Sequence, residues 1–359
     1  MHSVRVRLLL TGLLAALALA TGCSAGGSAA STAQAAAPDA KANELRLGFF
    51  ANVTHAPALV GVAEGILAKD LGATALKPQV FNAGPGTIEA LRAGSLDAAY
   101  VGLSAAINGF AQTKGQGLRI VSGAASGGAQ LVVRDTIGST AELKGKTLAS
   151  PQLGNIQDVA LRAWLAKEGL KTSVSGGGDV TIAPQENATT LQLFKDKKID
   201  GAWLPEPWAS RLVVEAGAKV LVDEKSLWPQ GQFATTQLVV RTEFLNAYPG
   251  TVKDLLTANL DAIDFIAANN AKAKQDTNEQ IDKLAGKPLS QRVIDRAWAN
   301  LTFTADPLAA TLQHSADDAV AAGTTQKVAL KGIVNLTRLE SLLAARGKPP
   351  VSDAGLGQR

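Results

Sequence analysis

The stretch TIEALRAGSLDAAYV at residues 87–101 has a counterpart, TLQLFKDKKIDGAWL, at residues 190–204. In both stretches, apolar residues at helical spacing end at a turn, an aspartate follows (Asp97 or Asp200), and an apolar run with an aromatic residue comes next. Helix–turn–strand units resemble one another, so one such match could arise by chance. The flanking segments agree as well, and we therefore predict two related halves.

Short apolar runs alternate with helical patterns on both sides of these stretches. Such alternation indicates βαβ units and a mostly parallel sheet in each half. The runs are Leu45–Phe50, Leu76–Phe81, Ala98–Val101 and Leu118–Ser122 in the first half, and Lys146–Ala149, Val180–Ala183, Gly201–Leu204 and Val220–Val222 in the second.

Two extended runs, Leu131–Arg134 and Gln237–Arg241, connect the halves, and the chain after the second is helical nearly to its end. We predict two hinged α/β lobes: lobe 1 from residues 44–133 and 240–347, and lobe 2 from residues 134–239. The C-terminal helices are expected to pack on lobe 1, and the tail at residues 348–359 is expected to fray. A cleft between hinged lobes is a common place for a small ligand.

Composition limits the classes of function. The chain has 359 residues, of which 46% are hydrophobic and 18% charged, so it can bury a substantial core. Its formal net charge is only +4, and Arg5 and Arg7 lie in a leader described below, so no nucleic-acid partner is expected. The single cysteine is Cys23. The body therefore has no disulfide, thiolate metal site or thiol nucleophile, and we predict no metal and no cofactor.

The N-terminus has the pattern of an export signal. Residues 1–22 combine a basic start, an apolar stretch at residues 8–20 and small residues before Cys23. Thirteen apolar residues are too few to span a bilayer. The sequence LATGC at residues 19–23 resembles the lipobox of bacterial lipoproteins, in which the cysteine is lipidated. Residues 24–43 are rich in Ala, Ser and Gly, so we predict a flexible tether from a lipidated Cys23 at the extracytoplasmic membrane face.

Five loops follow the expected strands at the edge where α/β proteins bind ligands. They are small, glycine-rich or rich in hydroxyl and amide groups, and four of them lead into helix N-termini. Backbone N–H groups and the positive helix end can hold an oxyanion without a lysine or arginine. The loops are Asn52–Pro57, Asn82–Thr87, Gly102–Ser104, Ser122–Gly128 and Pro151–Asp158.

Several candidates in these loops have a second interpretation. The glycines in AGPGT at residues 83–87 could let backbone amides approach a ligand, or the segment could be a plain connection with proline at a helix start. Ser104 and Asn155 could cap helices, donate to a ligand, or both. Gln157 and Asp158 could serve the helix dipole. His55 could donate a ring N–H to an anion or be purely structural.

The segment around Pro205-Glu206-Pro207 is also ambiguous. Glu206 could contact an ammonium group, hold a water molecule or cap the following helix. Trp208 could pack in the core or at the hinge, or line the cleft. Catalytic motifs such as Gly-x-Ser-x-Gly, His-Glu-x-x-His and the P-loop do not occur in the sequence.

Longer segments carry a resemblance to a known family. These are AGPGTIEAL at residues 83–91, AGSLDAAYVG at residues 93–102, LKGKT at residues 143–147 and DGAWLPEPW at residues 200–208, with LTFT at residues 301–304 and LKGIVNL at residues 330–336. Over residues 44–343 the chain resembles the solute-binding lipoproteins of ABC importers, in the aliphatic sulfonate, nitrate and taurine binding-protein family.

The resemblance implies a type II periplasmic-binding-protein fold, a small oxyanion ligand, and an ABC permease and its ATPase as partners. It implies no catalysis. An aliphatic sulfonate is the first expectation; nitrate, taurine or a pyrimidine precursor stays open, as do a pyrimidine-pathway enzyme and a sensor ectodomain. The ligand contacts implied by the resemblance are His55, Gly84, Gly86, Thr87, Ser104, Ser126, Asn155, Gln157, Asp158, Glu206 and Trp208.

Overall fold

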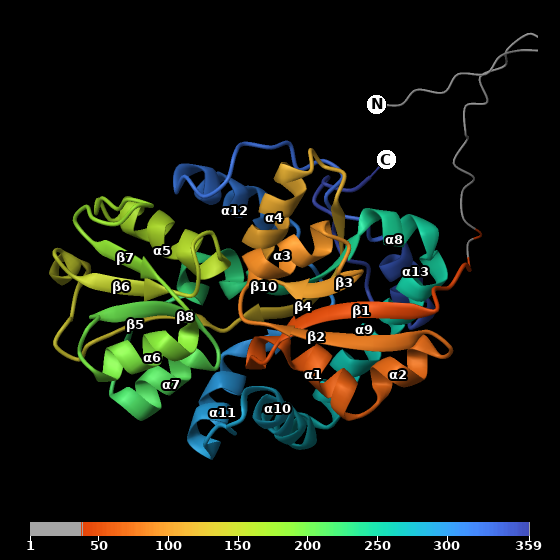
Figure 1. Cartoon of the computed structure of the whole chain (residues 1–359), viewed down its shortest axis with the longest axis horizontal. Helices are drawn as coiled ribbons and strands as arrows, with labels where there is room; N and C mark the ends of the chain where they lie inside the picture. Colours follow the sequence, from red (N-terminus) through yellow and green to blue (C-terminus); the bar gives the residue numbers. More distant parts are fainter. Residues whose placement is uncertain (1–36, 38, 359) are drawn as a thin grey trace, which may run out of the picture. The chain divides into compact units, whose positions relative to one another are not determined.

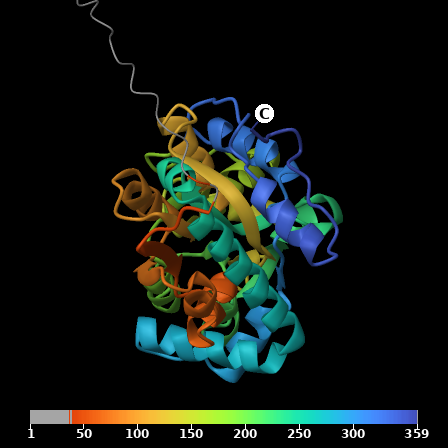
Figure 2. The same cartoon turned by 90° about the vertical axis from the view of Figure 1, so that its right-hand side faces the viewer.

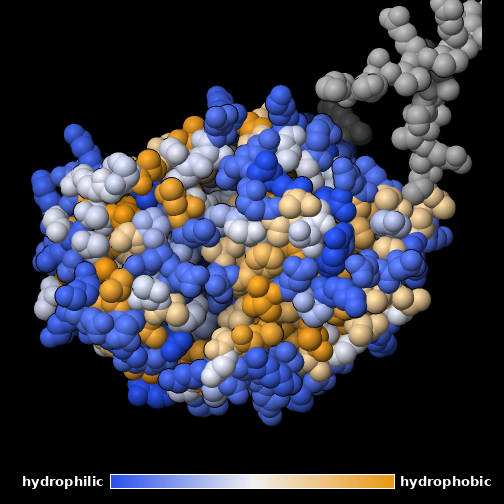
Figure 3. All heavy atoms as spheres, viewed as in Figure 1, coloured by the Kyte–Doolittle hydropathy of each residue, from blue (hydrophilic) through white to orange (hydrophobic). Residues whose placement is uncertain are grey.

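The computed structural model describes residue 37 and residues 39–358. The expected signal sequence, Cys23 and most of the expected tether lie outside the described residues. Within the described part of the chain, none of the helices combines the length and the apolar character that a membrane crossing requires. On the face shown in Figure 3, hydrophilic residues predominate and apolar residues lie in groups between them.

The first lobe is built on a six-stranded sheet in the order β11-β4-β10-β3-β1-β2 (Figure 1). The pairs β1–β2 and β1–β3 are parallel, whereas β10 runs antiparallel to β3 and β4, and β11 runs antiparallel to β4. The strands are β1 (Glu44–Phe50), β2 (Ala75–Phe81), β3 (Ala98–Val101), β4 (Leu118–Gly127), β10 (Ala234–Arg241) and β11 (Leu301–Phe303).

The second lobe has a five-stranded sheet in the order β7-β6-β8-β5-β9. Here β6 is parallel to β7 and β8, and β5 is antiparallel to β8 and β9. The predicted parallel sheets are thus mixed. In each lobe one antiparallel strand, β10 or β5, arrives from the other lobe, and in the first sheet β11 of the C-terminal segment is antiparallel as well. The strands are β5 (Ala129–Val133), β6 (Thr147–Ser150), β7 (Thr181–Pro184), β8 (Gly201–Pro205) and β9 (Lys219–Asp223).

Helices cover both faces of each sheet (Figure 1). Alternation along the strands of the second sheet explains why both faces need cover: Leu131 and Trp203 pack in one apolar cluster, and Val132 packs in another on the opposite face. The helices are α1 (Ala56–Ala63), α2 (Ile66–Leu71), α3 (Gly84–Arg92), α4 (Leu103–Gln112), α5 (Ile156–Lys167), α6 (Asn187–Lys195), α7 (Trp208–Ala216), α8 (Thr242–Ala247), α9 (Pro249–Ala268), α10 (Asn270–Ala285), α11 (Gln291–Ala299), α12 (Ala310–Ala321) and α13 (Thr337–Ala345).

The two aspartates of the sequence repeat occupy equivalent positions. Asp97 accepts the N–H of Arg46 at 3.0 Å, and Asp200 accepts the N–H of Thr147 at 2.9 Å. Arg46 lies in β1 and Thr147 in β6, the strands beside β3 and β8. Each aspartate therefore fixes the turn before its strand to the neighbouring strand, which explains why the pattern recurs in both halves.

Both observed boundaries between the lobes lie closer to the N-terminus than the sequence predicted. All of β5 pairs within the second sheet, and all of β10 pairs within the first. The chain therefore crosses between the lobes near Gly127 and Gly128, and again between Asp223 and Ala234. An extended apolar run fits either sheet, so its sequence pattern does not fix the crossing point.

The C-terminal segment packs mainly on the first lobe, as Figure 2 shows with this segment coloured teal to blue. Its helices α11 and α12 also contact α7 and α5 of the second lobe. The tail beyond residue 348 does not fray as expected over its described residues. Gly332 donates its N–H to the Leu356 carbonyl at 2.8 Å, and Leu356 packs against the apolar core.

Candidate functional site

A small cavity lies where the carboxyl ends of strands from both sheets meet. Its volume is about 20 Å³, slightly more than the roughly 10–15 Å³ that one water molecule needs. The cavity therefore suits a compact group. Its lining residues are Phe50, Asn52, Thr54, His55, Asn82, Gly102, Asn155, Ile156, Gln157, Asn187, Pro205, Thr235 and Thr236.

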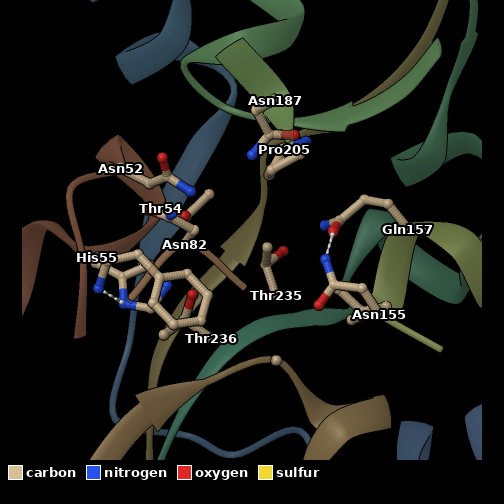
Figure 4. Close-up of a pocket in the computed structure, with 13 residues that line it drawn as sticks. Asn52, Thr54, His55, Asn82, Asn155, Gln157, Asn187, Pro205, Thr235 and Thr236 are labelled. Carbon is tan, nitrogen blue, oxygen red and sulfur yellow. Dashed lines mark hydrogen bonds between the residues drawn. The ribbon is translucent and has the colours of Figure 1, made fainter. Parts of the chain in front are cut away.

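The side chains around this cavity approach it from opposite sides. Figure 4 shows Asn52, Thr54 and His55 on one side and Asn155 and Gln157 on the other. Amide and hydroxyl groups predominate, and within the described part of the chain no Lys, Arg, Asp or Glu lines the cavity. Any charge on a ligand would therefore face uncharged hydrogen-bonding groups.

Four helices of the described chain begin at this cavity. His55, Gly102 and Asn155 are the N-cap residues of α1, α4 and α5, and Asn187 is the first residue of α6. Within the described residues, no side chain caps these four N-termini. The first N–H groups of a helix lack intrahelical acceptors and carry a partial positive charge, so the ends of α4, α5 and α6 at one cavity favour an anion. The start of α1 contributes less, because the Ala56 N–H donates to the Val53 carbonyl and Pro57 has no N–H.

His55 is held as a neutral donor. Its Nδ1 accepts the Phe50 N–H at 3.3 Å, and its ring stacks on Phe50 with centroids 4.2 Å apart. Burial lowers the pKa of His55 to about 3. Because Nδ1 is an acceptor in a neutral ring, Nε2 carries the proton. The expected ring donor is therefore available without a positive charge.

Asn155 and Gln157 form a pair on the second lobe. Asn155 Nδ2 donates to Gln157 Oε1 at 3.0 Å, and both side chains are buried. Asn155 is an N-cap by position, but its side chain makes no capping bond within the described chain. The pair leaves Asn155 Oδ1 as an acceptor and the Gln157 amide nitrogen as a donor.

Two buried oxygens on the cavity wall have no hydrogen-bond partner among residues 37 and 39–358. These atoms are Thr236 Oγ1 and Asn187 Oδ1. Buried polar atoms in folded proteins are nearly always paired. Their presence at the cavity indicates a place for a ligand or an ordered water molecule.

Of the eleven expected contacts, the structure places His55, Asn155 and Gln157 in the cavity. Gly84 lies directly behind it: a Cβ there would be 2.7 Å from the Ala105 Cβ and 3.2 Å from Asn155 Oδ1. Glycine at this position thus lets α3 approach the Asn155 side chain. Gly86 is exposed with open space around it and is not among the lining residues.

The side chains of Thr87, Ser104 and Ser126 do not line the cavity. Thr87 Oγ1 donates to the Ala83 carbonyl at 3.0 Å, within its own helix. Ser104 does not cap α4, whose N-cap is Gly102, and it lines a different cavity. Ser126 is a buried β4 residue paired with β10 and β11. The strand-end rule selected loops at the edge where the cavity lies, but it does not determine the direction of each side chain.

Asp158 has a structural role. It is fully buried, and it accepts hydrogen bonds from Ser150 Oγ at 2.7 Å, the Gly154 N–H at 3.0 Å and Arg162 Nε at 3.0 Å. These bonds tie the loop before α5 to β6 and to α5 itself. Asp158 therefore positions the loop that carries Asn155 and does not face the cavity.

Glu206 also points away from the cavity. Its carboxylate accepts the Ser210 N–H at 3.0 Å, Asn300 Nδ2 at 2.6 Å and Arg296 Nη1 at 3.2 Å. Burial raises the pKa of Glu206, and these donors oppose the rise. Of the three expected roles, the helix-capping one agrees with this geometry, and the added ion pair joins the second lobe to α11.

Trp208 links the lobes at the cavity rim. Its indole Nε1 donates to Asn52 Oδ1 at 3.0 Å. Because this bond occupies the amide oxygen of Asn52, the amide nitrogen of Asn52 is left for the cavity. The expected hinge role of Trp208 matches this contact, whereas the tryptophan itself is not among the lining residues.

Sequence reasoning missed several lining residues. Asn52, Thr54 and Asn82 lie in the expected loops but were not selected, and Asn187 follows β7, where the same strand-end rule could have found it. Thr235 and Thr236 belong to the antiparallel strand β10. The rule for parallel strands gives no signal for them.

Comparisons with known proteins agree with this architecture. A profile of the NMT1-like family matches residues 38–281. Four Brucella proteins, each named for a binding role, are 28% identical over 192 residues, or 53% of this chain and 57% of each relative. The chain thus spans little more than half the length of these relatives. The taurine-binding periplasmic protein of Escherichia coli is 27% identical over 234 residues, covering 65% of this chain and 70% of that protein.

Solved structures show the same fold at low identity. The alkanesulfonate-binding protein of Xanthomonas axonopodis pv. citri, bound to MOPS, superposes with a TM-score of 0.67 at 23% identity, covering 80% of this chain and 96% of that one. The periplasmic nitrate-binding protein of Synechocystis PCC 6803 gives a TM-score of 0.67 at 17% identity, covering 79% and 83%. The expected periplasmic-binding-protein fold is therefore confirmed. With a profile match over more than half of its length, the chain belongs to the NMT1-like family.

Proposed function

We propose that this protein is the extracytoplasmic binding component of an ABC importer. It captures a small oxyanion, with an aliphatic sulfonate as the first candidate, in the cavity lined by His55, Asn155 and Gln157, which we call the oxyanion cavity, and delivers it to the permease and its ATPase. The names of its relatives and structural neighbours, which include taurine-, alkanesulfonate- and nitrate-binding proteins, support this class. Capture and delivery require no catalytic step.

The convergence of the uncapped N-termini of α4, α5 and α6 carries the proposal of an oxyanion. Each helix end offers N–H donors and a partial positive charge equivalent to about half an elementary charge. A sulfonate has three oxygens to receive such donors. The neutral ring of His55 and the amide nitrogens of Gln157 and Asn52 add donors that need no counter-ion.

The size of the cavity favours a compact headgroup. A volume of about 20 Å³ is little more than one water molecule needs, so the lobes must separate further to admit a sulfonate group. Trp208 and Asn52 close the rim across the two lobes. A ligand that adds contacts to both lobes would stabilise this arrangement over an open one. Nitrate and the sulfonate group of taurine satisfy the same geometry and are the alternatives within the class.

A pyrimidine precursor is a second candidate. Phe50 offers an aromatic surface at the cavity, and Asn155 Oδ1 and Asn187 Oδ1 can accept hydrogen bonds from ring or amino N–H groups. An oxyanion cannot donate to these oxygens. Binding of an uncharged aminopyrimidine, with no binding of anions, would favour this candidate.

We also propose that the protein is anchored to the extracytoplasmic membrane face through a lipidated Cys23. The support is the lipobox-like sequence at residues 19–23 and the small, polar composition that follows. Intact-mass spectrometry of the membrane fraction tests this proposal. A diacylglyceryl-modified cysteine at the new N-terminus is expected, and an unmodified N-terminus beyond Cys23 would contradict it.

Isothermal titration calorimetry tests the ligand class. We expect saturable heat with at least one of methanesulfonate, taurine, sulfate and nitrate. Asn155→Ala should weaken that binding by about 1–3 kcal/mol, because it removes the buried hydrogen-bond partner that orients the Gln157 amide at the cavity. Gln152→Ala, an exposed position in the same loop, is the matched control and should bind as the parent does. No heat and no thermal shift with any of the four anions would overturn the proposal.

A further inference from the structure

A second hollow lies on the far side of Ile156, which lines both it and the first cavity. It consists of three adjoining spaces that share Trp228, with volumes of about 480, 120 and 20 Å³. We call it the Trp228 cavity. It lies between α5 and the 3-10 turn Glu224–Leu227 of the second lobe, and α4 and α12 of the first.

Aromatic side chains form much of its wall. Trp228 and Trp164 both line the middle space. Trp228 stacks on Phe233, with ring centroids 5.9 Å apart, and meets His314 edge-on at 5.0 Å. The partly exposed indole of Trp228 borders all three spaces. The face of an indole attracts cations.

Two carboxylates face the same space. Glu224 is buried, and its Oε2 accepts the Trp203 indole N–H at 2.7 Å. Asp318 of α12 lines the middle and inner spaces together with Glu224. Burial, together with the charges of Asp223 and Asp318, raises the pKa of Glu224 to about 7, against the opposing effect of the Trp203 and Trp228 indoles. The negative charge of such a buried carboxylate is poorly balanced by its surroundings, and a nearby cation would balance it.

The one lysine that lines these spaces in the described chain already approaches Asp318. Lys167 Nζ lies 3.6 Å from Asp318 Oδ1, while its side chain stays largely exposed. An ammonium group is thus accommodated at the mouth of the cavity, whereas Glu224 deeper inside has no lysine or arginine partner among the ion pairs of the described residues.

Ser104 provides an independent observation at the inner end. Its Oγ is buried, lines the inner space, and has no hydrogen-bond partner within the described part of the chain. Glu224 and Asp318 line the same space. A polar atom left unpaired beside two carboxylates indicates that an additional polar group belongs there.

We propose that the Trp228 cavity binds a small organic cation, whose ammonium group contacts Glu224 and Asp318 and whose methyl or methylene groups pack on the Trp228 indole. Carboxylates with an aromatic face are the recognition elements for such ligands. A metal ion fits less well, because the described residues contain no group of three potential ligands among His, Cys, Asp and Glu. This site is separate from the oxyanion cavity, and the proposal does not depend on the function proposed above.

Titration of the full chain with tetramethylammonium chloride at constant ionic strength tests the proposal, with calorimetry and tryptophan fluorescence as readouts. We expect saturable binding, and none with uncharged tert-butanol. Glu224→Gln and Trp228→Leu should each weaken binding at least tenfold. Glu168→Gln, which removes an exposed charge at the end of α5, should change it less than twofold.

Folding is checked by circular dichroism for every variant. If Glu224→Gln does not fold, Asp318→Asn, at a more exposed position, takes its place and should also weaken binding. Gln157→Glu, in the oxyanion cavity, should leave tetramethylammonium binding unchanged. Equal response to tert-butanol, or unchanged affinity in folded Glu224→Gln and Trp228→Leu, would overturn the proposal.

Discussion

The two cavities on either side of Ile156 are polar for different physical reasons. The oxyanion cavity is lined by amides, hydroxyls and helix N-termini without an ionised side chain in the described chain, whereas Glu224, Asp318 and Lys167 line the Trp228 cavity. The first presents backbone dipoles that suit negative charge, and the second presents carboxylates and an indole that suit positive charge. Helix α5 contributes to both walls, so neighbouring turns of one helix serve opposite electrostatic purposes.

The largest expected effect comes from removing the anchor of this shared helix. Asp158→Ala leaves Arg162 buried without its carboxylate partner, since the two side chains are 0% and 2% exposed. Breaking a buried ion pair in this way costs about 3–5 kcal/mol. Urea denaturation should show that loss in the free energy of unfolding.

Glu168→Ala, at an exposed position beside the same helix, is the control for Asp158→Ala and should change the free energy of unfolding by no more than about 0.5 kcal/mol. Equal stability of the two variants would show that Asp158 does not hold the wall between the cavities.

A charge placed in the oxyanion cavity should have the next largest effect. Gln157→Glu keeps an acceptor for Asn155 Nδ2 but adds a buried negative charge. Repulsion and desolvation should weaken binding of the oxyanion about 100-fold, or about 2.8 kcal/mol. Calorimetry measures the change. Gln152→Glu adds the same charge at an exposed position of the nearby loop, where solvent screens it. This control should weaken oxyanion binding less than threefold.

A smaller effect is expected at the rim that joins the lobes. Trp208→Phe keeps the aromatic ring but removes the indole N–H that donates to Asn52 Oδ1. One hydrogen bond contributes about 0.5–1.5 kcal/mol, so oxyanion affinity should fall two- to tenfold. The tetramethylammonium affinity should not change. Parallel loss of both affinities would indicate a general loosening of the second lobe instead.

A change of pH also separates the two cavities. The pKa of His55 is about 3, so between pH 6 and 8 this ring stays neutral and oxyanion affinity should vary less than twofold. The pKa of Glu224 is about 7, so the cation affinity should rise over the same range as the carboxylate ionises. Titrations at pH 6, 7 and 8 measure both. The charged and titratable groups around Glu224 are Asp223, Asp318, His314 and Lys167, and Glu224→Gln identifies its share of the change.

The contributions of His55 and Glu224 to the free energy of unfolding should change in opposite directions with pH. Burial lowers the folded-state pKa of His55 from 6.5, so the unfolded chain binds its proton first and this contribution is lost as pH falls from about 6.5 toward 3. The raised pKa of Glu224 makes the folded state bind its proton more tightly, and that contribution is lost as pH rises from about 4.5 to 7.

The sequence repeat predicted the two lobes because Asp97 and Asp200 perform the same backbone task. Their surroundings differ in a way that the repeat does not reveal. Asp97 also accepts side-chain hydrogen bonds from Arg46 and Arg241. In the second lobe, Arg134 donates to the Phe194 and Ile199 carbonyls instead. The backbone pattern is local and visible in the sequence. The side-chain partners of the aspartates come from distant parts of the chain, so the sequence does not reveal them.

The site was predicted only as far as the loops. The residues selected after parallel strands lie at the edge where the cavity is, and His55, Asn155 and Gln157 line it. Glu206 lies at the same edge but turns toward α11, nearly one hundred residues further along the chain, because Arg296 and Asn300 lie there. The Trp228 cavity was not predicted, since α12 completes it and no local pattern links α12 to α5.

The central claim is that uncharged donors at helix N-termini hold a small anion between the lobes. Its most direct test is a pair of calorimetric titrations with methanesulfonate and methanesulfonamide, which have nearly the same shape but differ by one negative charge. We predict saturable heat with methanesulfonate and at least tenfold weaker binding of the amide. Equal affinity for the two compounds, or preference for the neutral one, would contradict the account.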